Sequence, residues 1–336
     1  MISEADLVAA VLWLGVTVYA VLGGADFGAG LWDLLAGDAQ QGEAPRNLID
    51  ASIGPVWEAN HTWLIFDLVI LWSAFPVAFA SVMSTLFIPL TLAAFGIILR
   101  GSGFAFRKYT QRLSTRRTFG ATFAASSVIT PFFLGTALGA IASGRVPAGN
   151  ATGDPWTSWL NPTSILVGGL AVAAGAYVAA VFLVAAARRR HDAALERYFR
   201  QRALAMGIVT GGLSLAGIAI LHADAPALFA GLTGRALPLV AGSVILGSAG
   251  LLMIVRGAAR GIRPLAAAAV TAIIWGWGVA QLPAILPGSL TIDAAAAPAG
   301  TLDALIVISI VAALTIGPSL GLLFALDGRS RLEAHR

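Results

Sequence analysis

Nine apolar stretches, each long enough to cross a membrane as a helix, dominate this chain. A bilayer core requires about 20 apolar residues per helix. The stretches cover residues 6–31, 53–80, 82–104, 118–142, 162–187, 204–222, 236–255, 264–286 and 303–326. Only 11% of the residues are charged, against about 25% in soluble domains, so this composition does not provide a water-facing surface. The sequence therefore predicts an all-α, polytopic membrane protein with nine transmembrane helices.

The basic residues predict how these helices are oriented. Cytoplasmic loops of membrane proteins carry an excess of Lys and Arg. With the N-terminus outside, all but two of the 21 basic residues fall in inward-facing segments, and only Arg145 and Arg235 lie outside. We therefore expect an N-out, C-in topology in the cell (inner, cytoplasmic) membrane. The same clustering between apolar stretches argues against nucleic acid as the partner that a basic chain would otherwise suggest.

A short internal similarity predicts how the helices are grouped. Residues 99–101 (Leu-Arg-Gly) and residues 255–257 (Val-Arg-Gly) each end an apolar stretch, and their offset also superposes the first stretch on the fifth. We therefore divide the single membrane domain, 1–336, into a four-helix unit at 1–142, a second at 162–286 and a ninth helix at 303–326. Chance recurrence of three residues is the alternative explanation.

Two acids lie where lipid would otherwise be. Asp26 is near the inner end of the first stretch, roughly 7 Å deep at 1.5 Å per residue, and Glu58 is at a similar depth in the second. Charged groups inside a membrane are costly and mark functional sites by default. Paired carboxylates repel each other and are desolvated, so they can exchange protons near neutral pH. The functional interpretation is a proton relay entered from the cytoplasm. The alternative is that the acids are interfacial and are either hydrogen-bonded to loop backbone or paired with Arg46 or Arg100.

Further polar residues share the second stretch with Glu58. His61 is one helical turn from Glu58, and Asp67 is seven residues from Asn60, so both can extend the polar face. We assign Asn60, His61, Asp67 and Arg100 supporting roles. A separate set of residues is expected to serve in packing. Glycines spaced as in Gly24-x-x-x-Gly28 permit close helix approach. The motif and packing candidates are Gly24, Gly28, Gly30, Trp57 and Trp63.

The composition also limits metal and haem chemistry. The chain has no cysteine, which excludes thiolate metal sites and haem attachment through Cys. A haem iron needs an axial ligand such as His or Met, and only His61 and His222 lie near apolar stretches. No paired arrangement for a bis-His haem is visible. We therefore expect no metal and no haem ligand in this chain.

Three motifs resemble those of subunit II of cytochrome bd-type quinol oxidases. Residues 24–30 (GADFGAG) resemble the family's G-F-D-L-G-x-G stretch, and residues 55–64 (PVWEANHTWL) resemble its P-x-W-[DE]-x-N-x-x-W-L signature. Residues 99–107 (LRGSGFAFR) resemble its R-G-x-x-F-x-x-R element. The motifs occur in the family's order, and the length and expected helix number agree across essentially the whole chain.

The sequence departs from the family pattern at three positions. Ala25 replaces an aromatic residue, Glu58 stands where many members have Asp, and Ala59 stands where many have Gly. The extra methylene of Glu58 puts in doubt how far a relay at this position reaches. The form with His61 is more similar to the cyanide-insensitive branch.

The resemblance implies a role within a larger enzyme. Such a subunit II pairs with a subunit I that holds haems b and d and the quinol-oxidation site, and together they reduce O2 to water with protons from the cytoplasm. The resemblance places Asp26 and Glu58 at the acidic positions of that proton route. It implies no haem ligand in this chain, a structural quinone in some members, membrane lipid and quinone as further partners, and leaves open a small accessory subunit.

Two other functions compete with this one. A proton-coupled secondary transporter would show broken helices at the midplane and inverted repeats, whereas the repeat suspected here is parallel and the acids lie near one face. A purely structural subunit, whose acids only pack, is the third interpretation.

The topology gives the first testable prediction. We expect the C-terminus to lie in the cytoplasm, because loops rich in basic residues stay on that side of the membrane. A reporter fused to the C-terminus should therefore be located in the cytoplasm. Activity of an alkaline phosphatase fusion, which requires the outer side, should be absent there and present in a fusion within 143–161. The reverse pattern would contradict the N-out, C-in orientation.

Overall fold

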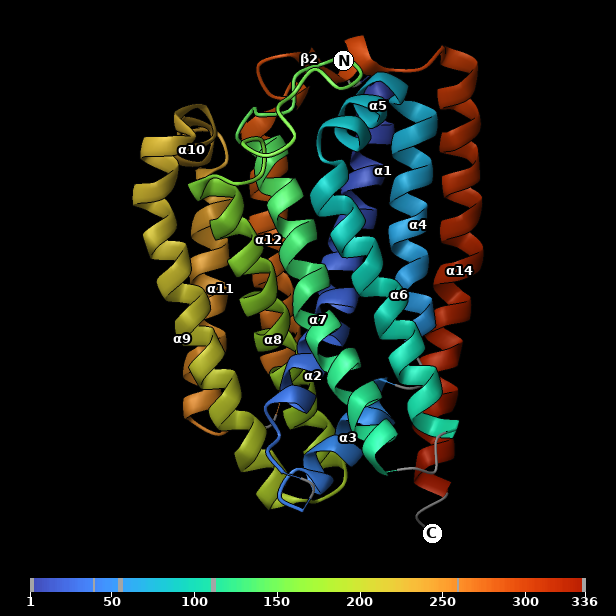
Figure 1. Cartoon of the computed structure of the whole chain (residues 1–336), viewed down its shortest axis with the longest axis vertical. Coiled ribbons are helices and arrows are strands. Elements are labelled where there is room, and N and C mark those ends of the chain that lie inside the picture. Colours follow the sequence, from blue (N-terminus) through green and yellow to red (C-terminus); the bar gives the residue numbers. More distant parts are fainter. Residues whose placement is uncertain (1–2, 39, 54–56, 110–112, 259, 334–336) are drawn as a thin grey trace.

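Long helices that run along one axis make up almost the whole molecule (Figure 1). The computed structural model describes residues 3–38, 40–53, 57–109, 113–258 and 260–333. Inside these ranges the side chains of 53, 57–59, 104, 107–109, 113–118, 320, 321 and 323–333 are not described. The N-terminal end of α1 and the C-terminal end of α14 lie at opposite ends of the bundle (Figure 1).

The elements follow in chain order. They are α1 (Glu4–Val18), the π-helical η1 (Tyr19–Gly23), α2 (Gly24–Leu34), α3 (Glu43–Ile53), α4 (Trp57–Ala74), α5 (Pro76–Thr85), α6 (Phe87–Tyr109), α7 (Leu113–Ala142), α8 (Pro162–Arg189), α9 (Ala193–Asp224), α10 (Pro226–Thr233), α11 (Leu237–Val255), α12 (Ile262–Gln281), β1 (Ala284–Leu286), β2 (Leu290–Thr291), α13 (Ile292–Ala295) and α14 (Ala299–Glu333).

The described residues confirm a polytopic, all-helical membrane protein. Among them, seven helices are long and apolar enough to cross a membrane, or up to eight if α5 and α6, bent by 84°, count as one span. The total of nine crossings stays a prediction, since α4 is not among the seven helices. The orientation of the helices in the membrane also stays a prediction.

The expected boundary between the second and third apolar stretches is wrong. Instead of one helix over 53–80, α4 ends at Ala74 and α5 begins at Pro76, with Phe75 between them at φ −133°. Proline lacks a backbone N–H and disfavours the helical conformation of the residue before it. The bend at Leu86 then replaces the expected start of a helix at 82.

Other boundaries differ at the helix ends. The stretch expected as helix over 264–286 ends at Gln281, and its last residues form β1, which pairs with β2 across a turn. Pro283, Pro287 and Gly288 explain this end because proline and glycine interrupt helices. The helix expected at 204–222 starts already at Ala193, where Asp192 caps it by accepting from the N–H groups of Ala194 and Leu195.

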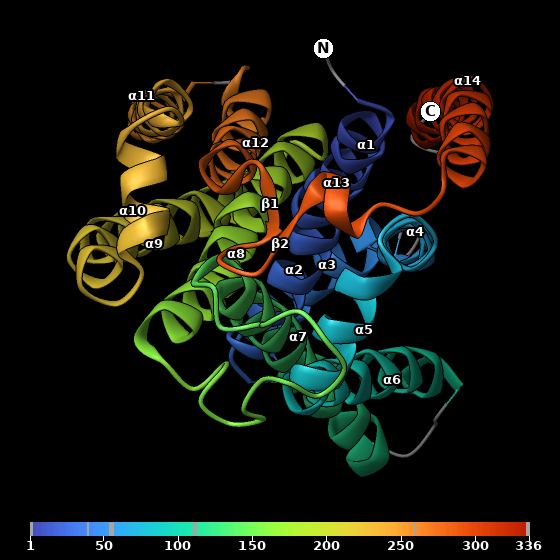
Figure 2. The ribbon, with the colours of Figure 1, turned by 90° about the horizontal axis from the view of Figure 1, so that it is seen from above.

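Helices α2 and α8 lie near the middle of the bundle, while α6, α9, α11 and α14 lie at its periphery (Figure 2). The two central helices approach closely because glycines face each other. A Cβ added to Gly28 would collide with the backbone of Gly175 and Ala176, and Gly24 also lies against Gly175. The indole Nε1 of Trp32 donates to the carbonyl of Ala176 at 2.9 Å. Without a hydrophobic driving force between helices in lipid, this close contact supplies the association energy.

The buried apolar residues form two large clusters that cross the expected division of the chain. One joins Trp32 and Leu48 to α8, α9 and α12, for example through Val181 and Phe199. The other joins α1, α4, α5 and α7 to the β1–β2 segment and the start of α14. Each cluster therefore contains residues from both expected four-helix units, and the division into 1–142 and 162–286 stays a prediction.

The Gly28–Gly175 contact yields a stability prediction. Gly28→Ala should lower the thermal stability of the purified protein, since overpacking a tight contact costs about 1–3 kcal/mol. Gly212→Ala in α9 is the matched control, because a Cβ there meets nothing within 4 Å. Equal melting temperatures for the two variants, measured in the same detergent, would contradict the close approach.

Candidate functional site

A buried ion pair between α2 and α6 forms the centre of the candidate site. The Asp26 carboxylate accepts from Arg100, whose Nη2 lies 2.7 Å from Asp26 Oδ1, and the same Nη2 donates to the Asp26 carbonyl at 3.1 Å. The side chains are only 2% and 0% exposed. Removing two charges from water costs several kcal/mol each, so such a pair requires near-ideal geometry and further hydrogen bonds.

Helix α7 supplies those further contacts to Arg100. Its Nη1 donates to the Ser127 hydroxyl, which itself donates to the Phe123 carbonyl at 2.6 Å. The guanidinium also lies between two rings, 4.9 Å from the Phe27 centroid and 4.4 Å from that of Phe123. Cations favour this position over aromatic faces. Arg100 therefore joins α2, α6 and α7.

Gly30 provides the space for this cluster. A Cβ at Gly30 would collide with the Ser127 hydroxyl and would lie 2.9 Å from Arg100 Nη1. The glycine of the GADFGAG motif thus lets α2 approach α7 at the level of the guanidinium.

The alternative interpretation expected Asp26 to pair with Arg46 or Arg100, and the structure shows the pair with Arg100, although it is buried rather than interfacial. Arg46 instead pairs with Asp33, with its Nε 3.1 Å from Asp33 Oδ1. Only one carboxylate oxygen of Asp26 is occupied by the pair. Within the described residues, Asp26 Oδ2 is buried and has no hydrogen-bond partner.

Glu58 and Trp57 lie in the first turn of α4, but their side chains fall outside the described part of the chain. The expected proximity of the Glu58 and Asp26 carboxylates therefore stays a prediction. Farther along α4, Asn60 is buried, and the His61 ring lies 5.8 Å from the Phe27 ring. Helix α4 thus brings Asn60 and His61, two of the expected supporting residues, to the level of Phe27 beside the Asp26–Arg100 pair.

Asp67 lies farther along α4 and lines a cavity of about 180 Å3. The carboxylate faces Gly15 of α1, and its buried Oδ1 has no hydrogen-bond partner among the described residues. Trp63 belongs to the same helix and packs against Phe66, with ring centroids 6.1 Å apart.

Sequence reasoning missed four residues of this region. Three of them, Tyr19, Trp277 and Gln281, line the cavity with Asp67, and each has a buried polar atom without a partner in the described structure. The Tyr19 ring packs edge-on against the Phe27 ring, with centroids 6.4 Å apart, and its hydroxyl inside an apolar stretch could have indicated it. Ser127 could have been noticed as half of a Ser-Ser pair inside an apolar stretch.

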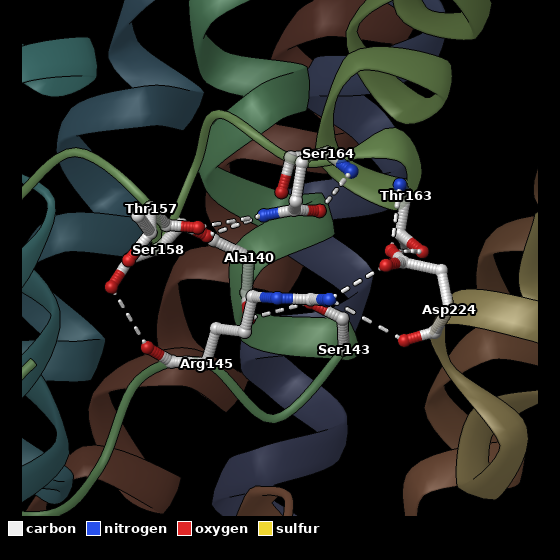
Figure 3. A network of polar contacts seen from close by, with 9 residues as sticks. Ala140, Ser143, Arg145, Thr157, Ser158, Thr163, Ser164 and Asp224 are labelled. Atoms are coloured by element: carbon white, nitrogen blue, oxygen red, sulfur yellow. Dashed lines mark hydrogen bonds and ion pairs between the residues drawn. The ribbon is translucent and has the colours of Figure 1, made fainter. Parts of the chain in front are cut away.

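A second polar cluster lies at the other end of the bundle and is structural (Figure 3). Arg145 Nη2 lies 2.7 Å from Asp224 Oδ1, and Asp224 Oδ2 accepts from the N–H and hydroxyl of Thr163 at 3.0 and 2.6 Å. Asn161 caps α8 by accepting from the Ser164 N–H at 2.9 Å. The cluster connects the 143–161 segment to the start of α8 and the end of α9. Arg145, one of the two arginines expected outside, therefore has Asp224 as a local partner.

The described residues contain no group of three or more His, Cys, Asp or Glu side chains that could hold a metal ion. His61 lies on α4, whereas His222 lies at the far end of α9, against Phe229. These two histidines therefore do not form a paired site.

The chain matches a family model described as cytochrome bd terminal oxidase subunit II over residues 5–326. Cytochrome bd ubiquinol oxidase subunit 2 of Bacillus subtilis (strain 168) is 31% identical over 129 residues, 38% of this chain and 36% of that protein. Cytochrome bd-I ubiquinol oxidase subunit 2 of Escherichia coli (strain K12) is 27% identical over 138 residues, 41% of this chain and 35% of that protein. These alignments span little more than a third of either relative.

The fold has a solved counterpart. A chain of the bd oxidase from Geobacillus thermodenitrificans superposes with a TM-score of 0.76 at 24% identity, covering 96% of this chain and 98% of that one. The helical arrangement is therefore shared along nearly the entire chain.

The buried ion pair gives a direct stability test. Arg100→Met should destabilise the protein by about 3–5 kcal/mol, because it leaves the Asp26 carboxylate buried without its cation. The double variant Arg100→Met/Asp26→Asn should recover part of that loss, since no charge remains unpaired. Thermal denaturation in detergent measures both, and a double variant no more stable than Arg100→Met would show that charge pairing does not decide the cost.

Proposed function

The chain belongs to the cytochrome bd terminal oxidase subunit II family, and from that premise we propose that it is the non-haem-ligating subunit II of a quinol oxidase that reduces O2 to water. In this role it supports a haem-bearing subunit I structurally and provides a route for proton uptake from the cytoplasm. The observation that carries the proposal is the buried Asp26–Arg100 pair inside the family motifs.

The Asp26 carboxylate has the geometry of a proton-accepting group. Arg100 holds Oδ1, while Oδ2 has no hydrogen-bond partner within the described residues. A proton can therefore be bound at Oδ2 without breaking the contact at Oδ1. Because the adjacent cation stabilises the ionised carboxylate, the proposal requires that Arg100 keep its contacts with Ser127 and the Asp26 carbonyl while Asp26 carries the proton.

Other residues extend the polar route in both directions. Glu58, in the first turn of α4, is the proposed entry group from the inner side. Tyr19 lines the cavity with Asp67 and packs edge-on against Phe27, the neighbour of Asp26, so it is the proposed link between the ion pair and the cavity. Asn60, His61 and Asp67 keep the supporting roles expected for them, and Arg100 positions Asp26.

Haems b and d belong to the proposed complex rather than to this chain. Haem iron requires an axial ligand such as His or Met, and His61 and His222 are separated by most of the bundle's length, on α4 and at the outer end of α9. We therefore assign the haems, the quinol-oxidation site and oxygen reduction to subunit I. A small accessory subunit is compatible with this assignment.

A structural quinone has a candidate site in the 180 Å3 cavity. Quinone carbonyls accept hydrogen bonds, and the Tyr19 hydroxyl and Trp277 Nε1 are donors without partners in the described structure. Ligand pockets typically begin at about 300 Å3, so this cavity accommodates at most a ring, with the apolar tail outside it.

The comparisons do not support the alternative of a proton-coupled secondary transporter. The break between α5 and α6 is sharp, but it lies at the end of the bundle where α1 begins (Figure 1). Transporter sites use broken helices near the midplane. A purely structural subunit remains the competing interpretation, and it predicts that the acids are dispensable for proton transfer.

Charge-neutral variants of the acids separate these two interpretations. Glu58→Gln and Asp26→Asn should slow quinol-driven O2 consumption on the order of 10²-fold, the lower end of what positioned proton-transfer groups contribute. Asp26→Asn leaves the buried Arg100 cation without a carboxylate, so the haem absorption spectrum is recorded for each variant and O2 consumption is compared only between complexes that keep it.

The matched control is Glu43→Gln, an exposed acid in the first turn of α3 at the same end of the bundle. It should leave O2 consumption unchanged. Full activity of both relay variants, with an intact haem spectrum, would instead support the structural interpretation.

A further inference from the structure

A concave, arginine-lined site lies at the basic end of the bundle, away from the ion pair. It is a cavity of about 560 Å3 between the last turns of α8 and the first turns of α12. Arg188, Arg189, Arg260 and Arg263 line it, together with apolar side chains that include Phe182. This end of the bundle is the one expected to face the cytoplasm.

One of these arginines fixes the shape of the cavity. Arg188 Nη2 lies 2.7 Å from Glu196 Oε1 and 3.2 Å from the Gly257 carbonyl, and its Nη1 donates to the Ala258 carbonyl. Arg188 thereby connects α8 to α9 and to the segment between α11 and α12. Its charge is balanced by Glu196, so it serves as a structural part of the wall.

Two other arginines keep their charge available. Arg260 and Arg263 are exposed, and neither has a carboxylate within ion-pair distance among the residues that the structure describes. The Arg263 guanidinium lies 4.9 Å from the Phe182 ring centroid, which holds it over the cavity. An arginine fork can donate two hydrogen bonds to a phosphate.

Helix α12 adds a positive end to the same cavity. It begins at Ile262 after Gly261, whose φ of +89° favours glycine, and its first turn carries no acid. The first N–H groups of a helix have no intrahelical acceptor, and the helix dipole favours an anion there. Gly261, Ile262 and Arg263 all line the cavity, so this end contributes to it directly.

The lining changes from basic to apolar with depth. Phe182 lies six residues before Arg188 on α8, and Ala267 lies four residues after Arg263 on α12. At 1.5 Å per residue these positions are roughly 9 and 6 Å deeper into the bundle. A free anion needs only the charged rim, whereas a lipid presents a phosphate followed by apolar chains.

We propose that this cavity binds the headgroup phosphate of an anionic phospholipid from the surrounding bilayer, with the phosphate between Arg260 and Arg263 and the acyl chains along Phe182 and the deeper wall. Basic pockets between transmembrane helices on the cytoplasmic side bind such headgroups. The site goes beyond the proposed proton route and shares none of its residues.

Lipid binding to the purified oxidase complex tests the site. Native mass spectrometry would compare short-chain phosphatidylglycerol with short-chain phosphatidylcholine, which carries the same phosphate but no net charge. The wild type should prefer phosphatidylglycerol. Arg260→Gln/Arg263→Gln should weaken that binding roughly 25-fold, since each basic residue near an anionic headgroup contributes roughly fivefold, and should lower the preference for phosphatidylglycerol over phosphatidylcholine.

Two controls keep the result interpretable. Arg190→Gln/Arg197→Gln removes the same charge from exposed positions at the same end that do not line the cavity, and it should keep the preference. Arg260→Lys/Arg263→Lys keeps the charge and should retain most of the binding. An unchanged haem spectrum in each variant shows that the complex is intact.

Three outcomes would overturn the proposal. Equal loss in the two Gln pairs would mean a general surface-charge effect. No loss in Arg260→Gln/Arg263→Gln would mean that the cavity does not bind the lipid. Displacement of phosphatidylglycerol by excess inorganic phosphate at constant ionic strength would assign the site to a free anion instead.

Discussion

The guanidinium of Arg100 is the contact on which the packing of α2, α6 and α7 depends. It is fully buried, it neutralises Asp26 on α2, and it reaches Ser127 on α7 while extending from α6. A buried cation tolerates little displacement, because any loss of a partner exposes an uncompensated charge to a medium that solvates it poorly. Three helices are therefore held in one register by a single side chain. The aromatic rings of Phe27 and Phe123 also lie against the guanidinium.

Glycines make that geometry reachable. Helices in lipid associate through close packing of small residues rather than through burial from water. Gly28 brings α2 against Gly175 of α8, and Gly30 leaves room for the Arg100 and Ser127 side chains. The motif that carries the buried acid is thus also the motif that allows its surroundings to assemble. A side chain at Gly28 would collide with the α8 backbone, and one at Gly30 would collide with Ser127, so helix packing and the buried ion pair depend on the same short motif.

Hydrophobic runs were sufficient to predict an all-helical membrane protein, because about 20 apolar residues have few alternatives in a bilayer. They were insufficient at Phe75 and Leu86, where apolar composition continues through a break set by Pro76 and by local packing. Asp26 was identified from its cost inside a membrane, but its partner was not, since Arg46 and Arg100 are equivalent until the rotation of each helix is known. The cavity residues Trp277 and Gln281 come from the far end of the chain, and only tertiary packing brings them beside Asp67.

The π-helical turn η1 explains how one continuous rod serves both the ion pair and the cavity. Helix α1 packs on α4 and α14, whereas α2 packs on α7 and α8, so the rod changes partners at Tyr19–Gly23. π-turns inside α-helices occur frequently at functional sites. Tyr19 begins this turn, and Gly23 has no side chain to obstruct its ring. Asp26 follows within α2 while Tyr19 lines the cavity beside Asp67. The π-helical turn therefore lies between the two polar regions, at the point where the rod exchanges one set of neighbouring helices for another.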